Sequence, residues 1–197
     1  MSLRSILAGP GLLLAAAISG CTTMPVTSMV KLARVDLSST DPALLRAAIK
    51  LPHALRLRPQ GNALRVAVKL RSGEEEAQEF ALQPVTDPGD AAALQAERDP
   101  RTHLTAYRID PGELTKVIAF RDRLKSRQQA TGGSGGMLTI SVRPQACRAG
   151  ALPDGPILFT TYLRTQETGS YVPLARDLDL RGLAPAADLA TLLPPCE

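Results

Sequence analysis

The chain has 197 residues, of which 44% are hydrophobic and 21% charged, a balance typical of a globular protein whose length suits one domain. Only 3% of the residues are aromatic and none is Trp. We therefore expect a core of Leu, Val, Ile and Ala, and no aromatic platform on which bases or sugars could stack. The formal net charge of +4 is too small to indicate a nucleic-acid-binding protein.

The first 20 residues have the parts of a secretory signal: Arg4, an apolar stretch over 6–18, and small residues after it. The apolar stretch is about 13 residues long and is interrupted at 9–11 by Gly-Pro-Gly, whereas a membrane-spanning helix needs about 20 residues. The pattern favours a segment that is cut away over a membrane span or a core helix.

The signal-like segment ends in Ile18-Ser19-Gly20-Cys21, which resembles the lipobox of bacterial prolipoproteins. The resemblance implies that signal peptidase II cleaves before Cys21, that the thiol of Cys21 carries a diacylglycerol, and that its new amine is acylated. The chain as a whole resembles the small envelope lipoproteins of proteobacteria. Ordinary secretion with an incidental cysteine and an uncleaved anchor are the alternatives.

This resemblance divides the chain into a cleaved signal peptide over 1–20, a lipidated cysteine with a short tether over 21–28, and a single globular domain over 29–197. Thr22 stands where related lipoproteins of the inner membrane carry Asp, which favours the outer membrane, facing the periplasm. The periplasmic side of the inner membrane is the alternative. The tether reaches at most about 25 Å, so the domain is expected close to its membrane.

The first predicted elements of the domain are a strand over 29–36 and a helix over 42–51. Asp41-Pro42 opens the predicted helix, since Asp caps free backbone N–H groups and Pro suits the first helical position. Leu44, Leu45, Ala48 and Ile49 then fall on one side of a helix.

A meander of three strands is predicted next, over 55–59, 63–71 and 77–83. In the middle strand apolar and polar residues alternate strictly, which is typical of a half-buried antiparallel strand. Acidic residues follow this cationic strand, so cross-strand ion pairs are expected on its wet face. The residues expected to pair there are Glu75, Glu76 and Glu79 with Arg65, Lys69 and Arg71.

Asp-Pro dipeptides precede two further predicted helices, a short one over 91–97 and a longer one over 111–130, with a strand over 102–109 between them. The longer helix carries five cations that could contact anionic headgroups or lipid A phosphates. The alternative is an ordinary solvated face whose cations favour the helix dipole. These cations are Lys116, Arg121, Arg123, Lys125 and Arg127.

The last third of the chain is predicted to be mostly strands, after a Gly-rich loop over 131–136. Strands are expected over 137–143, 156–164 and 170–176, and the last is an edge or a bulge because of Pro173. An edge strand or turn follows over 175–182, and a final helical turn or two over 185–193.

Cys147 and Cys196 remain once Cys21 is assigned to lipid. An even pair in an oxidising compartment predicts a disulfide, and closing a loop of about 50 residues would contribute roughly 4 kcal/mol. A metal site would need more ligands than His53 and His103 supply, and a redox pair would usually show C-x-x-C spacing. We expect the structural disulfide, with no metal and no cofactor.

No residue set with the pattern of a catalytic site stands out. Ser134 lies in a G-x-S-x-G match, but a helix precedes this loop and a strand follows it, the reverse of a nucleophile elbow. His53 and His103 are each expected at a turn or on the surface, and the carboxylates do not have calcium-loop spacing. We therefore expect a protein that is not an enzyme.

The predicted fold is α+β: mainly antiparallel sheet, which could be sandwich-like, with one longer helix at about 111–130 packed on it. An all-β sandwich with helical insertions is the alternative. The expected function is that of a non-enzymatic accessory, assembly or adaptor lipoprotein that binds another envelope protein or anionic lipid. The alternatives are a ligand- or lipid-binding periplasmic module and, less favoured, a hydrolase acting on envelope material.

Overall fold

The computed structural model describes residues 28, 31–32, 35, 39–70, 73–130, 137–183 and 186–197. The predicted signal peptide, the lipobox-like sequence, most of the predicted tether and the predicted loop at 131–136 lie outside these ranges. So does most of the strand predicted over 29–36, within which Lys31 and Leu32 are helical rather than extended.

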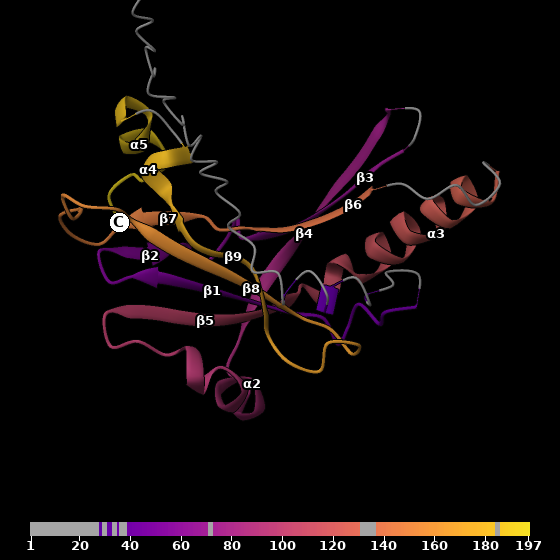
Figure 1. The fold of residues 1–197 in the computed structure, drawn as a ribbon, viewed down its shortest axis with the longest axis horizontal. Helices are drawn as coiled ribbons and strands as arrows, with labels where there is room; N and C mark the ends of the chain where they lie inside the picture. The colour runs from indigo at the N-terminus through magenta and orange to yellow at the C-terminus, as the bar shows by residue number, and fades with distance from the viewer. Residues whose placement is uncertain are drawn as a thin grey trace, which may run out of the picture.

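The centre of the molecule is one antiparallel sheet of seven strands in the order β6-β3-β4-β5-β1-β8-β9 (Figure 1). A separate two-stranded ribbon pairs β2 with β7. The strands are β1 (Arg46–Pro52), β2 (Leu55–Leu57), β3 (Ala63–Lys69), β4 (Glu75–Val85), β5 (Thr102–Ile109), β6 (Met137–Arg143), β7 (Ala146–Arg148), β8 (Leu158–Arg164) and β9 (Val172–Asp179). The α+β prediction, with mostly antiparallel β structure, is confirmed.

Strand β4 belongs to both halves of this sheet. Its first part, up to Ala81, pairs with β3, and its second part, from Leu82 onward, pairs with β5. A strand that changes partners in this way turns a corner of a sandwich-like fold, and in Figure 1 β3 and β6 cross the direction of β1 and β5. The two edge strands, β6 and β9, contact each other, so the sheet nearly closes around its core.

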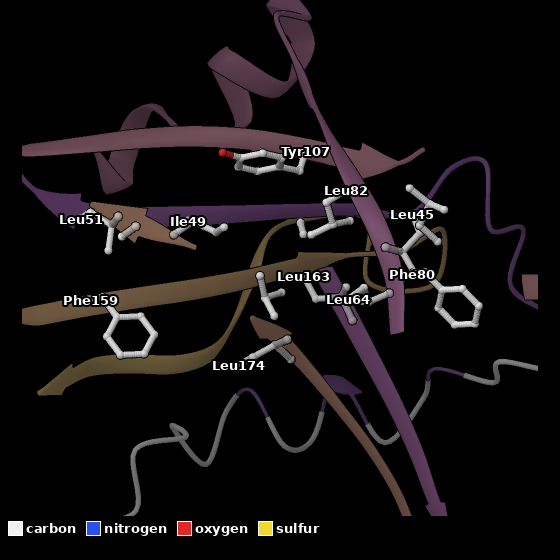
Figure 2. Close-up of a cluster of buried hydrophobic side chains, with 14 of the residues drawn as sticks. Leu45, Ile49, Leu51, Leu64, Phe80, Leu82, Tyr107, Phe159, Leu163 and Leu174 are labelled. Carbon is white, nitrogen blue, oxygen red and sulfur yellow. The ribbon is translucent and has the colours of Figure 1, made fainter. Parts of the chain in front are cut away.

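The core is enclosed by the concave side of this curled sheet (Figure 2). It is mainly aliphatic, as the composition predicts, with a few aromatic rings among the Leu and Ile side chains. The side chains labelled in Figure 2 are Leu45, Ile49, Leu51, Leu64, Phe80, Leu82, Tyr107, Phe159, Leu163 and Leu174.

The helix predicted over 42–51 is wrong, because Arg46–Pro52 forms the strand β1. Asp41 does cap a turn, since its carboxylate accepts a hydrogen bond from the N–H of Ala43 at 2.9 Å, but the chain leaves that turn extended. Leu45, Ala47, Ile49 and Leu51 also have the period of two of a strand. Because β5 and β8 pair with β1 on its two sides, the strand period prevails.

The longer helix is confirmed. It begins with the 3-10 turn η2 (Pro111–Glu113), where Asp110 accepts a hydrogen bond from the N–H of Gly112 at 2.8 Å, and continues as α3 (Leu114–Ala130). Phe120 is its buried anchor at 3% exposure and meets the ring of Phe80 edge-on, with 5.9 Å between the ring centroids. Helix α3 therefore covers one end of the core and extends beyond the sheet (Figure 1).

Short helices cover other parts of the sheet. α2 (Pro88–Ala93) and the 3-10 turn η1 (Gln95–Glu97) occupy the region of the short predicted helix, while α4 (Leu180–Leu183) and α5 (Ala186–Leu192) follow β9. Leu189 of α5 and the adjacent Leu193 join the main core. In Figure 1, α2 lies on the opposite side of β1 and β5 from α4 and α5.

Candidate functional site

A cluster of charged and tyrosine side chains lies on the outer face of the sheet, where the α2–η1 segment packs against β1, β5 and β8. The apolar contacts there form a second, smaller cluster, in which Ala48, Ala106 and Tyr162 from the strands meet Leu94 from the segment. The partly buried side chains packed against it are Val85, Leu104 and Tyr171. Charged side chains surround this second cluster. We call them the outer-face network; its members are Arg46, Lys50, Asp90, Glu97, Tyr162, Arg164, Tyr171 and Arg176.

Asp90 of α2 is the most deeply buried charged member of the network, with 2% exposure. Its two carboxylate oxygens lie 3.4 Å from Nε of Arg46 and 3.1 Å from a terminal nitrogen of Arg164. The hydroxyl of Tyr171 donates a further hydrogen bond to it at 2.9 Å. Two cations and one hydroxyl thus replace the water that this carboxylate would otherwise bind.

Glu97 of η1, seven positions after Asp90, repeats the arrangement. Arg176 binds it through two hydrogen bonds of 2.9 and 3.2 Å, Lys50 lies at 3.7 Å, and the hydroxyl of Tyr162 donates to it at 2.7 Å. The hydrogen bond from Arg176 lowers the pKa of Glu97 against the opposing effect of burial. Burial and the contact with Glu97 raise the pKa of the Tyr162 phenol.

A bulge between β8 and β9 borders the network. The pairing register shifts between Phe159 and Tyr162, and Asp177 has a φ of 51°, the one positive φ of a non-glycine residue among the described residues. Thr160, fully buried, holds this backbone: its hydroxyl accepts a hydrogen bond from the N–H of Asp177 at 3.1 Å and lies 3.2 Å from the carboxylate. The bulge directs Arg176 towards Glu97 on the outer face.

The contacts of this network indicate a structural role. A general acid or base at neutral pH needs a pKa near 7, whereas the pKa of Glu97 is lowered and the pKa values of Tyr162 and Tyr171 are raised. Each carboxylate already has two cationic partners and a hydroxyl. The arrangement therefore holds the α2–η1 segment on the sheet and leaves neither Asp90 nor Glu97 free to receive a substrate.

Sequence reasoning did not select these residues. Asp90, Glu97 and Asp177 are only three among many acidic residues, and their partners lie up to 81 positions away. A usable signal exists in β1, where Arg46, Ala48 and Lys50 alternate with the core residues. Two cations on either side of a small alanine indicate that this face of the strand can be covered by a segment that carries acidic residues.

The cations predicted on the longer helix are mostly paired. Arg123 lies 3.3 Å from Glu76, and Arg127 lies 3.2 Å from Glu74 and 3.3 Å from Glu76. The pair Lys116–Glu113 spans 2.6 Å and the pair Arg121–Asp122 spans 3.8 Å. Lys125 alone of the five makes no ion pair with the described residues. Acidic neighbours thus offset much of the positive charge of α3.

The cross-strand ion pairs of the meander form in part as predicted. Arg65 lies 3.1 Å from Glu75 and 3.9 Å from Glu79, and Glu79 also pairs with Arg143 of β6 at 2.9 Å. Glu76 turns instead to the cations of α3, and Arg71 lies outside the described residues. Lys69, which is exposed, makes no ion pair with the described residues, so of the three predicted cations Arg65 is the one seen to pair as predicted.

The disulfide predicted between Cys147 and Cys196 is present, with a Cα–Cα distance of 5.0 Å. It fixes the last residues against β7, where the N–H of Cys196 donates to the carbonyl of Arg148 at 2.9 Å and Arg148 donates to Pro194 at 2.8 Å. The guanidinium of Arg148 also donates to the carbonyl of Leu193 at 2.8 Å. The last residues are thus held in the fold.

The two histidines lie together, which sequence reasoning did not foresee. Nδ1 of His53 lies 2.9 Å from Nε2 of His103, and Nε2 of His53 lies 2.7 Å from the carbonyl oxygen of Pro100. Both residues are exposed, in agreement with the prediction for each taken singly. They are brought together because β1 ends beside the beginning of β5.

Three further features concern the predicted absence of a catalytic site, a metal site and a membrane span. Ser134 lies outside the described ranges. Within those ranges, no group of three or more His, Cys, Asp or Glu side chains is arranged to hold a metal ion. None of the described helices combines the length and the apolar content needed to cross a bilayer.

Comparison with known proteins adds no relative. No protein-family model matches the chain, and no curated protein and no solved structure is significantly similar to it.

Proposed function

We propose that this protein is a lipid-anchored protein of the bacterial envelope with a non-enzymatic accessory, assembly or adaptor role. The observation that carries the proposal is the sequence Ile18-Ser19-Gly20-Cys21 at the end of a signal-like segment. Acyl chains on Cys21 would anchor the protein durably, because each buried methylene contributes about 0.8 kcal/mol.

The Cys147–Cys196 disulfide supports the assignment to an extracytoplasmic compartment. Disulfides persist in oxidising compartments such as the bacterial periplasm and are rare in the cytosol. Cys147 is 8% exposed and the bond joins β7 to the chain end, so its role is structural. The outer membrane, facing the periplasm, is the location we propose, and the periplasmic side of the inner membrane is the alternative.

The outer-face network supports a binding role over hydrolysis. Its carboxylates are paired with cations and accept hydrogen bonds from tyrosine hydroxyls. These contacts hold the α2–η1 segment on the sheet. A rigid surface held near the membrane by a short tether suits a protein that positions or assembles other envelope components.

The alternative of an interior lipid- or ligand-binding module has less support. The apolar cavity between α3 and the sheet is lined by residues such as Leu64, Phe80, Phe120 and Leu124 and has a volume of about 40 Å³. Ligand pockets usually have volumes of about 300–1,000 Å³. This cavity would not hold an acyl chain unless α3 moved away from the sheet.

Metabolic labelling with a palmitate analogue tests the anchor. We expect incorporation into the unaltered chain and none into a Cys21→Ser variant. A Cys147→Ser/Cys196→Ser double variant is the matched control, because it removes the other two cysteines and should keep the label. Continued labelling of Cys21→Ser would refute the lipobox assignment.

Crosslinking in living cells, followed by mass spectrometry, tests the adaptor role. We expect the membrane-anchored chain to yield a reproducible envelope protein that the unanchored Cys21→Ser variant recovers more weakly, because the anchor concentrates the domain at its membrane. If no envelope protein is enriched above background, the adaptor role loses its support and the binding-module alternative gains weight.

A further inference from the structure

We propose that His53 and His103 form an exposed binding site for a divalent transition-metal ion, with Cu(II) as the preferred ion. The proposal is independent of the lipid anchor and of any partner. These are the two histidines of the chain, and the fold places them side by side although they are 50 positions apart in sequence.

The backbone fixes the positions of both rings. His103 is the second residue of β5 and pairs with Leu51 of β1, and Pro52 pairs with Thr102. Immediately after β1, the N–H of His53 donates to the carbonyl of Arg101 at 3.2 Å. The two side chains therefore project from neighbouring strand ends joined by hydrogen bonds, and little conformational entropy is lost when both bind one ion.

The distance between the ring nitrogens fits two adjacent ligands of one metal ion. Nδ1 of His53 and Nε2 of His103 lie 2.9 Å apart, and the ring planes meet at 77°. Two metal–nitrogen bonds of about 2.0–2.1 Å that meet at a right angle also separate the nitrogens by about 2.9 Å, whereas a tetrahedral angle separates them by about 3.3 Å. The spacing thus fits the square-planar or tetragonal geometry of Cu(II).

His53 has the outer contact that metal-binding histidines usually have. Its Nε2 lies 2.7 Å from the carbonyl oxygen of Pro100, which can only accept, so the ring proton sits on Nε2 and the lone pair of Nδ1 is directed at His103. A backbone carbonyl in this role fixes the tautomer and the orientation of a ligand histidine.

The proton balance of binding is simple. In the metal-free pair, Nε2–H of His103 donates to Nδ1 of His53. When an ion binds both nitrogens from one side of the line that joins them, this proton moves to Nδ1 of His103, so two neutral imidazoles bind the ion with no net loss of a proton.

The charges around the pair define how strong the site can be. Arg101 is already bound by Asp99 through hydrogen bonds of 3.0 and 3.2 Å. Arg56 makes no ion pair within the described ranges, and its charge opposes a dication. Replacing Arg56 by Gln should therefore tighten metal binding, by about threefold if its effect resembles that of other exposed charges. The remaining coordination positions face solvent and would hold water.

The test is a Cu(II) titration of the full chain in mild detergent, purified without a polyhistidine tag and carrying Cys21→Ser so that position 21 offers neither a lipid nor a thiol. Glycine in the buffer suppresses weak adventitious binding. We expect one Cu(II) per chain, and an electron paramagnetic resonance spectrum with hyperfine coupling to two equatorial imidazole nitrogens. This nitrogen count is made on a chain with both histidines, so it does not depend on whether a variant folds.

Variants locate the site. His53→Gln and His103→Gln should each weaken binding at least tenfold and leave one coupled nitrogen, whereas Lys125→Gln, on α3, should change nothing. Ni(II) and Zn(II) should bind more weakly than Cu(II). The proposal is overturned if the parent chain shows no saturable binding in glycine buffer, or if the His53→Gln/His103→Gln double variant binds Cu(II) as tightly as its parent.

Discussion

The two faces of the β1–β5–β8 layer are covered by different kinds of contact. On the inner face, Ile49, Tyr107 and Leu163 pack into a continuous aliphatic core. On the outer face, a smaller apolar cluster is surrounded by two carboxylates, four cations and two tyrosine hydroxyls. The same strands thus use non-directional burial on one side and directional ion pairs on the other.

These two kinds of contact give the inner and outer faces different roles in the fold. Burial of apolar area stabilises the fold without demanding one geometry. The outer-face network is satisfied only where Asp90 meets Arg46 and Arg164 while Glu97 meets Lys50 and Arg176, because an unpaired buried charge is costly. The inner face therefore supplies most of the stability, and the outer face determines where the α2–η1 segment sits. Four variants, taken from the largest expected effect to the smallest, test this division.

The largest effect is expected on the inner face. Leu163→Ala should lower the free energy of unfolding by about 3 kcal/mol, because Leu163 is fully buried and its truncation leaves a cavity. Urea unfolding followed by circular dichroism measures the loss. Leu183→Ala, at a leucine that is 58% exposed, is the matched control and should change it by less than about 0.5 kcal/mol. Equal losses in the two variants would contradict the placement of the core.

Asp90→Asn should cost about 2 kcal/mol, because it leaves Arg46 and Arg164 without their buried carboxylate. Native-state hydrogen exchange should show that the backbone amides of α2 open more often, while those of α3 do not. Asp87→Asn is the control: Asp87 caps α2, and Asn caps a helix equally well, so it should be nearly neutral. Unchanged exchange in Asp90→Asn would show that the network does not fasten this segment.

A smaller effect is expected from the pH dependence of the outer face. The pKa of Glu97 is lowered in the folded state from 4.5, so its stabilising effect is complete above about pH 5 and is lost as the pH falls through the folded pKa. Glu97→Gln should therefore lose less stability than the parent between about pH 5 and pH 3. Because Glu97 is partly exposed, the difference should stay near or below about 1 kcal/mol. The measurement is the free energy of unfolding of both proteins at several pH values. If it falls by the same amount in the parent and in Glu97→Gln between about pH 5 and pH 3, the prediction is contradicted.

The smallest effect is expected at the rim of the sheet. Arg143→Gln removes an ion pair with Glu79 in which the side chains are 56% and 48% exposed. Such pairs contribute roughly 0–1 kcal/mol and are screened by salt, so unfolding midpoints should barely change. Thermal unfolding at low and high salt measures this. A loss comparable to that of Asp90→Asn would erase the distinction between exposed and buried pairs.

Much of the fold could be predicted from local patterns. The alternation around Leu64 and Val66 identifies β3, and Asp110 with Pro111 identifies the start of the longer helix, because these signals lie within a few residues of each other. The stretch after Asp41 could not be assigned in this way. Leu45, Ala48 and Ile49 fit a helix while Leu45, Ala47 and Ile49 fit a strand, and only pairing with β5 and β8 decides between them.

The polar sites were less accessible to prediction. The contact between Asp90 and Arg164 and the contact between His53 and His103 join residues that are distant in sequence, and no spacing rule relates them. Cys147 and Cys196 are the exception. The compartment implied by the lipobox and the even number of remaining cysteines together select a long-range contact, and the fold brings the two residues together.

The measurement that tests the central proposal most directly is the intact mass of the protein purified from bacterial membranes. We expect a chain that begins at Cys21, with the added mass of a diacylglycerol and an amide-linked acyl chain on that residue and with Cys147 and Cys196 oxidised. A mature chain that begins at another residue, or one that begins at Cys21 without lipid, would contradict it.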